Sequence, residues 1–360
     1  MKAAVLYQAR QLLRIEDIEI DEPQPHEVLI KTKASGVCHS DLHFVDGLLS
    51  CPLPAVLGHE AAGIVEKVGA AVTYVKPGDH VVVTLSVFCG HCKQCLTGHP
   101  ACCQSTDVKR DPAAKPRLFR DKTPYFQFYN VSSFAEKLLL HENALVKIDD
   151  NIPFATAALM GCAVITGFGA IFNTTKVEIG SNVAVFGCGG VGLSLIQAAS
   201  ITGAGKIVAI DIFENKLQIA KKFGATHLIN ASTTNPLDAL AKIIPEGIDY
   251  AFECIGNKHV VEQALATLAP RGTLTLLGLI PENQKIEIAN TALHFERKIQ
   301  GCRMGSNRFR LDVPYYLDLY RQNRLKLDEL VSTEINLENI NAAFSAMKSG
   351  EVIRSVIVFD

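Results

Sequence analysis

The chain has 360 residues, long enough for two domains, and its 48% hydrophobic content is sufficient for large cores. Charged residues make up 20% and the formal net charge is −2, which gives no support for a nucleic-acid or anionic-membrane partner. The N-terminus acquires charge too early for a signal peptide, and no apolar run approaches the ~18 residues of a membrane span. We therefore expect a soluble cytoplasmic protein whose eleven cysteines stay reduced.

The first 150 residues are β-rich in pattern. β-Branched runs at 27–37 and 61–72 predict strands, and 63–83 predicts strand, turn and strand with Pro77, Gly78 and Asp79 as the turn.

After residue 160 the pattern changes to alternating strands and helices. It predicts strands at 182–186, 206–211, 248–256 and 272–279, with helices at 193–200, 215–224 and 258–269. Such alternation is typical of a doubly wound parallel sheet in an α/β fold. Two further helices, at 315–325 and 337–350, and a strand at 355–360 close the chain.

A glycine-rich turn lies between the strand at 182–186 and the helix that follows it. Its residues are Gly187, Cys188, Gly189, Gly190, Val191 and Gly192. Such a turn lets a pyrophosphate approach the helix N-terminus, and Asp211, at the end of the next strand, suits the adenosine ribose hydroxyls. The acidic residue favours NAD over NADP; the alternative is a glycine turn that binds nothing.

Residues 88–104, FCGHCKQCLTGHPACCQ, contain five cysteines. The spacing of Cys89, Cys92, Cys95 and Cys103 suits a closed tetrahedral zinc site, which would be structural because no ligand position stays open. Cys102 replaces Cys103 equally well on spacing alone. A redox Cys-x-x-Cys motif is the less favoured alternative, because it involves two cysteines rather than four.

Three further residues suggest a second metal site. Cys38, His59 and Cys162 supply the ligand types of a catalytic zinc with an open fourth position. They are far apart in the sequence, so spacing does not establish that they converge, and each alone has a plain alternative as a core residue.

These motifs together resemble the zinc-dependent medium-chain alcohol dehydrogenases over essentially the whole chain. The matching segments are GVCHSD with His43, GHE followed by AAGIVEKVG, the four-cysteine lobe and GCGGVG. The resemblance implies a GroES-like β-barrel catalytic domain at 1–163 with the structural zinc lobe at 88–104. It further implies a Rossmann NAD-binding domain at 164–303 and a C-terminal segment, 304–360, that returns to the catalytic domain. It favours Cys103 over Cys102.

The resemblance also implies roles for individual residues, with two zinc ions per subunit and NAD as cofactors. Cys38, His59 and Cys162 match the catalytic zinc ligands, Ser40 and His43 a proton relay, Glu60 an acid behind the zinc, and Asp41 a carboxylate that orients His59. Residues matching cofactor contacts, besides the glycine turn, are His39, Thr166, Asp211, Lys216 and Arg354. Residues matching the substrate channel are Leu49, Leu85 and Val108.

The implied activity is the reversible oxidation of primary alcohols, medium-chain, allylic or aromatic, to aldehydes. The alternative is a glutathione-dependent formaldehyde dehydrogenase, but Asp107 stands where that branch has an arginine, and Leu48 and Leu49 carry no acid. A non-catalytic nucleotide-binding relative is disfavoured because the zinc ligands are present. The basic segment 105–133 does not match cleanly, and its length favours a homodimer, with a homotetramer as the alternative.

Overall fold

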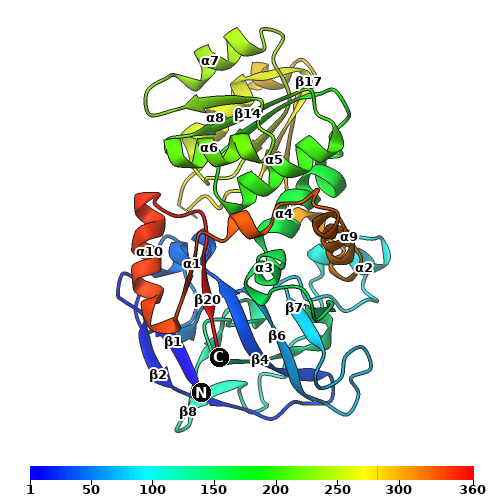
Figure 1. Ribbon diagram of the computed structural model, residues 1–360, viewed down its shortest axis with the longest axis vertical. Coiled ribbons are helices and arrows are strands. Elements are labelled where there is room, and N and C mark those ends of the chain that lie inside the picture. Colours follow the sequence, from blue (N-terminus) through cyan, green and yellow to red (C-terminus); the bar gives the residue numbers. More distant parts are fainter. Residues whose placement is uncertain (282) are drawn as a thin grey trace. The chain divides into compact units, whose positions relative to one another are not determined.

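The computed structural model describes residues 1–281 and 283–360, and the chain divides into two compact units. The first comprises Met1–Cys162, Arg308–Tyr320 and Leu327–Asp360, and the second comprises Ala163–Asn307 and Arg321–Lys326. Figure 1 shows the course of the chain.

The first unit is built mainly of antiparallel strands. Its strands are β1 (Lys2–Leu6), β2 (Arg14–Asp17), β3 (Glu19–Ile20), β4 (Glu27–Gly36), β5 (Ala55–Val56), β6 (Glu60–Val68), β7 (His80–Val83), β8 (Leu118–Arg120), β9 (Thr123–Pro124), β10 (Phe126–Gln127), β11 (Lys137–His141), β12 (Leu145–Lys147), β19 (Thr333–Ile335) and β20 (Ser355–Val358). Its helices are α1 (His39–Val45), α2 (Lys93–Leu96), α3 (Phe154–Ala158), α9 (Phe309–Arg321) and α10 (Ile340–Ser349). The main sheet runs β12-β7-β6-β4-β20-β19, with β11 also paired to β4, so the C-terminal strand closes on a strand from the start of the chain.

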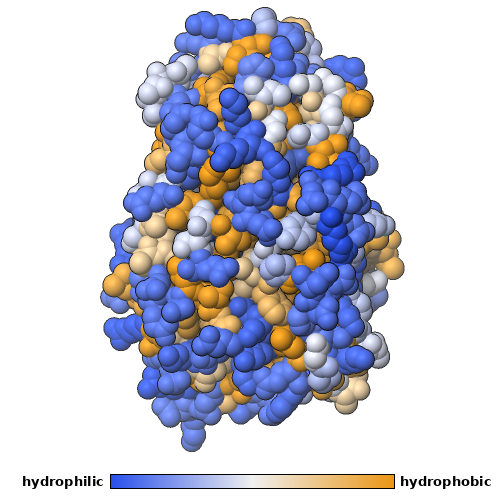
Figure 2. Space-filling model, viewed as in Figure 1, coloured by the Kyte–Doolittle hydropathy of each residue, from blue (hydrophilic) through white to orange (hydrophobic). Residues whose placement is uncertain are grey.

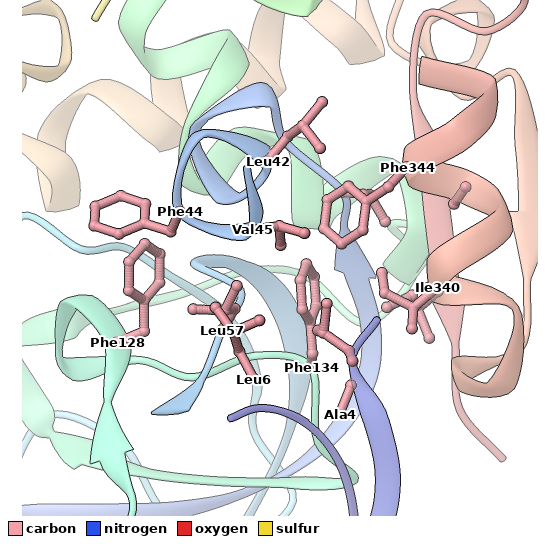
Figure 3. Close-up of a cluster of buried hydrophobic side chains, with 14 of the residues drawn as sticks. Ala4, Leu6, Leu42, Phe44, Val45, Leu57, Phe128, Phe134, Ile340 and Phe344 are labelled. Atoms are coloured by element: carbon pink, nitrogen blue, oxygen red, sulfur yellow. The ribbon is translucent and has the colours of Figure 1, made fainter. Parts of the chain in front are cut away.

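An apolar core lies between α1, α10 and the strands around them. Figure 3 shows the side chains of Leu42, Phe44 and Val45 on α1 facing those of Leu57, Phe128 and Phe134. Ile340 and Phe344 of α10 belong to the same cluster. This packing anchors α1, whose N-terminus carries several of the predicted site residues.

The described residues of the second unit form a parallel sheet. Its strands are β13 (Asn182–Phe186), β14 (Lys206–Asp211), β15 (His227–Asn230), β16 (Ile248–Glu253), β17 (Leu268–Leu276) and β18 (Lys298–Gly301), in the order β15-β14-β13-β16-β17-β18. Its helices are α4 (Ala163–Gly169), α5 (Gly190–Thr202), α6 (Glu214–Lys222), α7 (Pro236–Ile243) and α8 (Lys258–Ala266). Since parallel crossovers are right-handed, chain growth in opposite directions from β13 covers both faces of the sheet, as in a Rossmann fold.

The strands and helices expected from the sequence are therefore confirmed, including the Pro77–Asp79 turn between β6 and β7. Among the described residues no single helix is long and apolar enough to cross a membrane; the helices at Phe154–Gly161 and Ala163–Thr175 reach the threshold only when taken together across a bend. Hydrophilic residues predominate on the face in Figure 2, with apolar residues interspersed.

Candidate functional site

A buried cluster of two thiols, an imidazole and a carboxylate lies in the first unit. Ligand atoms of Cys38, His59, Glu60 and Cys162 are within 4.8 Å of one another, and all four residues are buried. Cys38 follows β4, His59 and Glu60 stand at the start of β6, and Cys162 follows the 3-10 turn Leu159–Gly161. The fold thus brings together the three segments that sequence spacing left unconnected.

One nitrogen of His59 is fixed and the other is left for a ligand. His59 Nδ1 donates to Asp41 Oδ1 at 3.0 Å, and Asp41 also accepts from the backbone N–H groups of Cys38 and Gly58 at 3.2 and 3.1 Å. Nε2 is buried without a hydrogen-bond partner. Burial disfavours the charged imidazolium, but Asp41 outweighs burial and raises the pKa of His59. Two thiols and an imidazole held by a carboxylate are a donor set that fits zinc.

Glu60, the carboxylate of this cluster, forms a buried ion pair with Arg354. Arg354 is 3% exposed, lies 3.1 Å from Glu60 through Nη2, and donates to the Val37 carbonyl through Nη1 at 2.8 Å. Burial raises the pKa of Glu60 to about 7, although the Arg354 guanidinium opposes the shift. The family resemblance assigns Arg354 to the pyrophosphate; the structure shows its ion pair with Glu60, and its contact with the cofactor stays a prediction.

The predicted relay residues lie on the first turns of α1. Ser40 is half-buried and His43 stands three residues further, so the two side chains occupy neighbouring positions on one helix face. Burial lowers the pKa of His43. His39, the first residue of the helix, is exposed.

Aromatic rings lie beside His59. The ring centroids of Phe128 and Tyr129 lie 6.1 and 5.8 Å from that of His59, and Phe44 packs edge-on against Phe128 at 4.7 Å. Sequence reasoning missed these rings, because they fall in the segment that did not match the family cleanly. The aromatic run FQFYN was the available signal.

The structure does not gather the three predicted channel residues. Leu49 packs against the α1–α10 core, whereas Leu85 and Val108 belong to the cluster around β6, β7 and β11. Val108 also lines a cavity of about 620 Å³, together with His91 and Asp107. The channel role of Leu49, Leu85 and Val108 stays a prediction.

The four cysteines of the 88–104 lobe converge. Ligand atoms of Cys89, Cys92, Cys95 and Cys103 lie within 4.8 Å of one another, whereas Cys102 is exposed and outside the group. The Cys92 sulfur is 3.6 Å from Cys95 Sγ and 3.8 Å from Cys103 Sγ. Burial opposes ionisation, but backbone N–H groups at His91 and Cys92 lower the pKa of Cys89 to about 6. Four thiols at these separations fit a closed zinc site.

The basic residues of the segment after the lobe are largely neutralised within the first unit. Arg117 Nε lies 2.7 Å from Glu27, Arg110 pairs with both Glu27 and Asp21, and Arg120 lies 3.0 Å from Glu16. These ion pairs bind the segment to the N-terminal strands.

Replacing Glu27 by Gln should lower the free energy of unfolding by about 3 kcal/mol, because two buried arginines lose their shared carboxylate. Burial alone would raise the pKa of Glu27, but Arg110 and Arg117 hold it below its usual range. Its stabilisation is therefore present above its ordinary pKa and lost as the pH falls through the lowered value. E27Q should remove that part of the acid dependence.

Urea denaturation across the acid range measures both effects. Glu22→Gln is the matched control, since its pair with Lys67 is exposed and should contribute little. Equal stability of E27Q and wild type would show that the arginines do not depend on this carboxylate.

The glycine turn of the second unit is shaped for a pyrophosphate. Gly187 has φ +97°, and a Cβ at Gly192 would lie 1.8 Å from the Gly187 carbonyl oxygen. A Cβ at Gly189 would meet no atom within 4 Å, so this glycine leaves open space before α5, which begins at Gly190 with Val191 half-buried behind it. Backbone N–H groups at a helix N-terminus are suited to phosphate oxygens.

Asp211 closes β14 beside this turn. Its carboxylate accepts from the backbone N–H groups of Cys188 at 2.7 Å and Phe213 at 3.0 Å. Lys216 is buried, with its ammonium 4.7 Å from the Phe213 ring centroid, and Thr166 donates to Met304 Sδ at 3.7 Å. Glycine turn and carboxylate together fit the pyrophosphate and adenosine ribose of a dinucleotide.

Comparison with known proteins agrees with both sites. Residues 24–150 match the alcohol dehydrogenase GroES-like domain, and residues 190–321 match the zinc-binding dehydrogenase family. A class-3 alcohol dehydrogenase of Drosophila melanogaster is 40% identical over 99% of this chain and 97% of its own length. A probable S-(hydroxymethyl)glutathione dehydrogenase of Schizosaccharomyces pombe is 38% identical over 99% and 96%.

Benzyl alcohol dehydrogenase from Acinetobacter calcoaceticus has a similar solved structure, with a TM-score of 0.93, 34% identity and coverage of 100% of this chain and 99% of that one. Matches of this extent establish the family. The chain belongs to the zinc-dependent medium-chain alcohol dehydrogenases, enzymes that use zinc and NAD to oxidise alcohols.

Proposed function

We propose that the protein oxidises primary alcohols with apolar or aromatic tails to aldehydes, reversibly, with NAD as hydride acceptor. The observation that carries the proposal is the buried Cys38–His59–Cys162 cluster, with an unpartnered His59 Nε2 and aromatic rings beside it. Zinc bound by these three residues would supply a Lewis acid that lowers the pKa of an alcohol hydroxyl.

This chain's own residues supply orientation and proton movement. Asp41 holds the His59 ring so that Nε2 is directed away from the hydrogen bond. Ser40 Oγ accepts the substrate hydroxyl proton as it gives up its own to the relay, and His43 passes a proton on toward solvent, a task suited to an imidazole. The buried ring of Phe128 excludes water near His59, and the half-buried ring of Tyr129 offers apolar surface for the tail of the alcohol.

We assign the remaining ligands in the same way. Cys89, Cys92, Cys95 and Cys103 hold a structural zinc, and Gly187–Gly192 with Asp211 bind NAD. Residues 1–163 and 304–360 form the catalytic domain and 164–303 the cofactor domain, an assignment that the division into compact units supports except at Ala163, 304–307 and 321–326, which fall in the second unit.

A glutathione-dependent formaldehyde dehydrogenase is the second candidate, because the two curated relatives described above carry class-3 and S-(hydroxymethyl)glutathione dehydrogenase names. Asp107 argues against it. This carboxylate lies 2.7 Å from His91 Nε2, and it would repel rather than hold a glutathione carboxylate.

Initial rates of NAD reduction with methanol, ethanol, hexanol, benzyl and cinnamyl alcohols should rise with the size of the apolar tail, since a larger tail buries more apolar surface. Formaldehyde with glutathione should give little turnover, and NADP should replace NAD poorly. Turnover confined to formaldehyde plus glutathione would overturn the assignment and identify the second candidate as the function.

We propose a homodimer. Within the described residues β18 is the outer strand of its sheet, and Leu293 and Phe295 before it are 39% and 63% exposed, a combination suited to pairing between copies. Light scattering should give the mass of two chains; a tetramer or monomer would contradict this. Thiolate zinc ligation requires reduced cysteines, which favours the cytoplasm, and cell fractionation tests that placement.

A further inference from the structure

A buried carboxylate without a counter-ion stands at the carboxyl end of β16. Glu253 is 0% exposed, and its Oε1 accepts from the backbone N–H groups of Ile255 at 2.9 Å, Gly256 at 2.8 Å and Asn257 at 3.4 Å. Oε2 is buried with no hydrogen-bond partner, and within the part of the chain that the structure describes no cationic side chain pairs with this residue. Burying an unpaired carboxylate carries a substantial desolvation cost, so a purely structural role would be served better by a neutral side chain.

Three backbone N–H donors to Oε1 stabilise the ionised form of Glu253, whereas burial of the side chain disfavours it. Burial raises the pKa of Glu253, but the backbone N–H donors oppose that shift because they stabilise the charged carboxylate. The backbone carbonyl of the same residue accepts from Leu277 and Gly278 at 2.9 and 3.0 Å. Glu253 therefore connects the loop after β16 with the loop after β17.

The sheet order indicates which half of the dinucleotide lies above this carboxylate. Strand order reverses between β13 and β16, and dinucleotides bind across such a switch point at the carboxyl ends of the strands. Asp211, at the end of β14, marks the adenosine side, so the nicotinamide falls on the side of β16. The loop after β16, which Glu253 holds through Ile255, packs against the glycine turn. A Cβ placed at Gly187 would lie only 2.7 Å from Ile255 Cγ1.

The two redox states of the cofactor differ in charge only at this end. The nicotinamide ring carries +1 in NAD+ and is neutral in NADH, while the adenosine and pyrophosphate are the same in both. A fixed negative charge in a low-dielectric site near the ring therefore stabilises the oxidised form selectively. We propose that Glu253 sets the preference of the cofactor site between NAD+ and NADH by favouring NAD+; the inference rests on the NAD site proposed above.

The test is equilibrium binding of each cofactor form, which does not depend on turnover. Glu253→Gln keeps the shape and the Oε1 acceptor but removes the charge. Its Kd for NAD+ should rise about fivefold or more while its Kd for NADH is unchanged, so the ratio of the two moves. Asp249→Asn is the matched control: it neutralises a carboxylate on the same strand that also accepts a backbone N–H, from Asn182 at 2.8 Å, at the far end of β16. Its ratio should equal that of wild type.

If the Kd values for NAD+ and NADH rise by the same factor in E253Q, Glu253 only maintains the loops, and the inference is overturned. An unchanged ratio in E253Q would overturn it as well. If E253Q does not fold, Glu253→Met provides the neutral side chain for the same comparison. Failure of wild type to bind NADH at all would instead contradict the NAD site itself, so the two failures are distinguishable.

Discussion

Cys162→Ser should lower kcat for alcohol oxidation about a thousandfold and reduce the zinc content from two ions per chain to one. The substitution preserves volume but removes one of three strong ligands from the buried cluster, leaving only Cys38 and His59 with the carboxylate of Glu60. NADH binding should persist, because the glycine turn Gly187–Gly192 and Asp211 belong to the second compact unit.

Metal analysis, steady-state rates and NADH titration measure these three effects. Cys51→Ser is the matched control, since Cys51 is a half-buried free thiol outside both metal clusters and should leave all three unchanged. Retention of two zinc ions and full turnover in C162S would remove Cys162 from the proposed ligands.

Cys103→Ala should release the other zinc and destabilise the first unit strongly. The 88–104 lobe has little core of its own: no residue of α2 is buried, and Ala101 is the buried residue of the following turn. The fold of such a segment depends on the metal, and a structural zinc contributes about 10 kcal/mol or more of apparent binding free energy. Thermal unfolding and zinc content give the measurement.

Cys102→Ala is a sharp control for this experiment because it changes the adjacent residue. Cys102 is exposed and lies outside the cluster of sulfurs, so the variant should keep two zinc ions and the melting temperature of wild type. Loss of zinc from C102A with retention in C103A would reverse the assignment.

Local patterns were the most predictable part of the protein. The glycine turn follows a strand and opens a helix, so its context was readable from neighbours in the sequence, and Asp211 lies where the next strand ends. The four-cysteine lobe is equally local. The choice between Cys102 and Cys103 needed the family resemblance, because both satisfy the spacing and only the path of the turn at Pro100–Cys102 separates them.

Long-range convergence was not predictable from residue types. Cys38, His59 and Cys162 meet only because β4 and β6 pair and the chain returns after α3. The ion pair of Glu60 with Arg354 joins residues almost 300 positions apart, and it gives the buried arginine a counter-charge that the sequence did not reveal. Phe128 and Tyr129 were missed for a related reason: the sequence shows their aromatic run, but the packing of that run on His59 depends on the tertiary fold.

The most direct test of the central claim follows the hydride itself. Benzyl alcohol with both carbinol hydrogens replaced by deuterium is oxidised by the wild-type enzyme with NAD, and the reduced cofactor is analysed by mass spectrometry. The account predicts one deuterium in each NADH formed, benzaldehyde as the product, and formation of labelled NADH by C162S about a thousandfold more slowly. Reduced cofactor without deuterium, or formation of labelled NADH by C162S at the wild-type rate, would contradict hydride transfer from an alcohol at the Cys38–His59–Cys162 site.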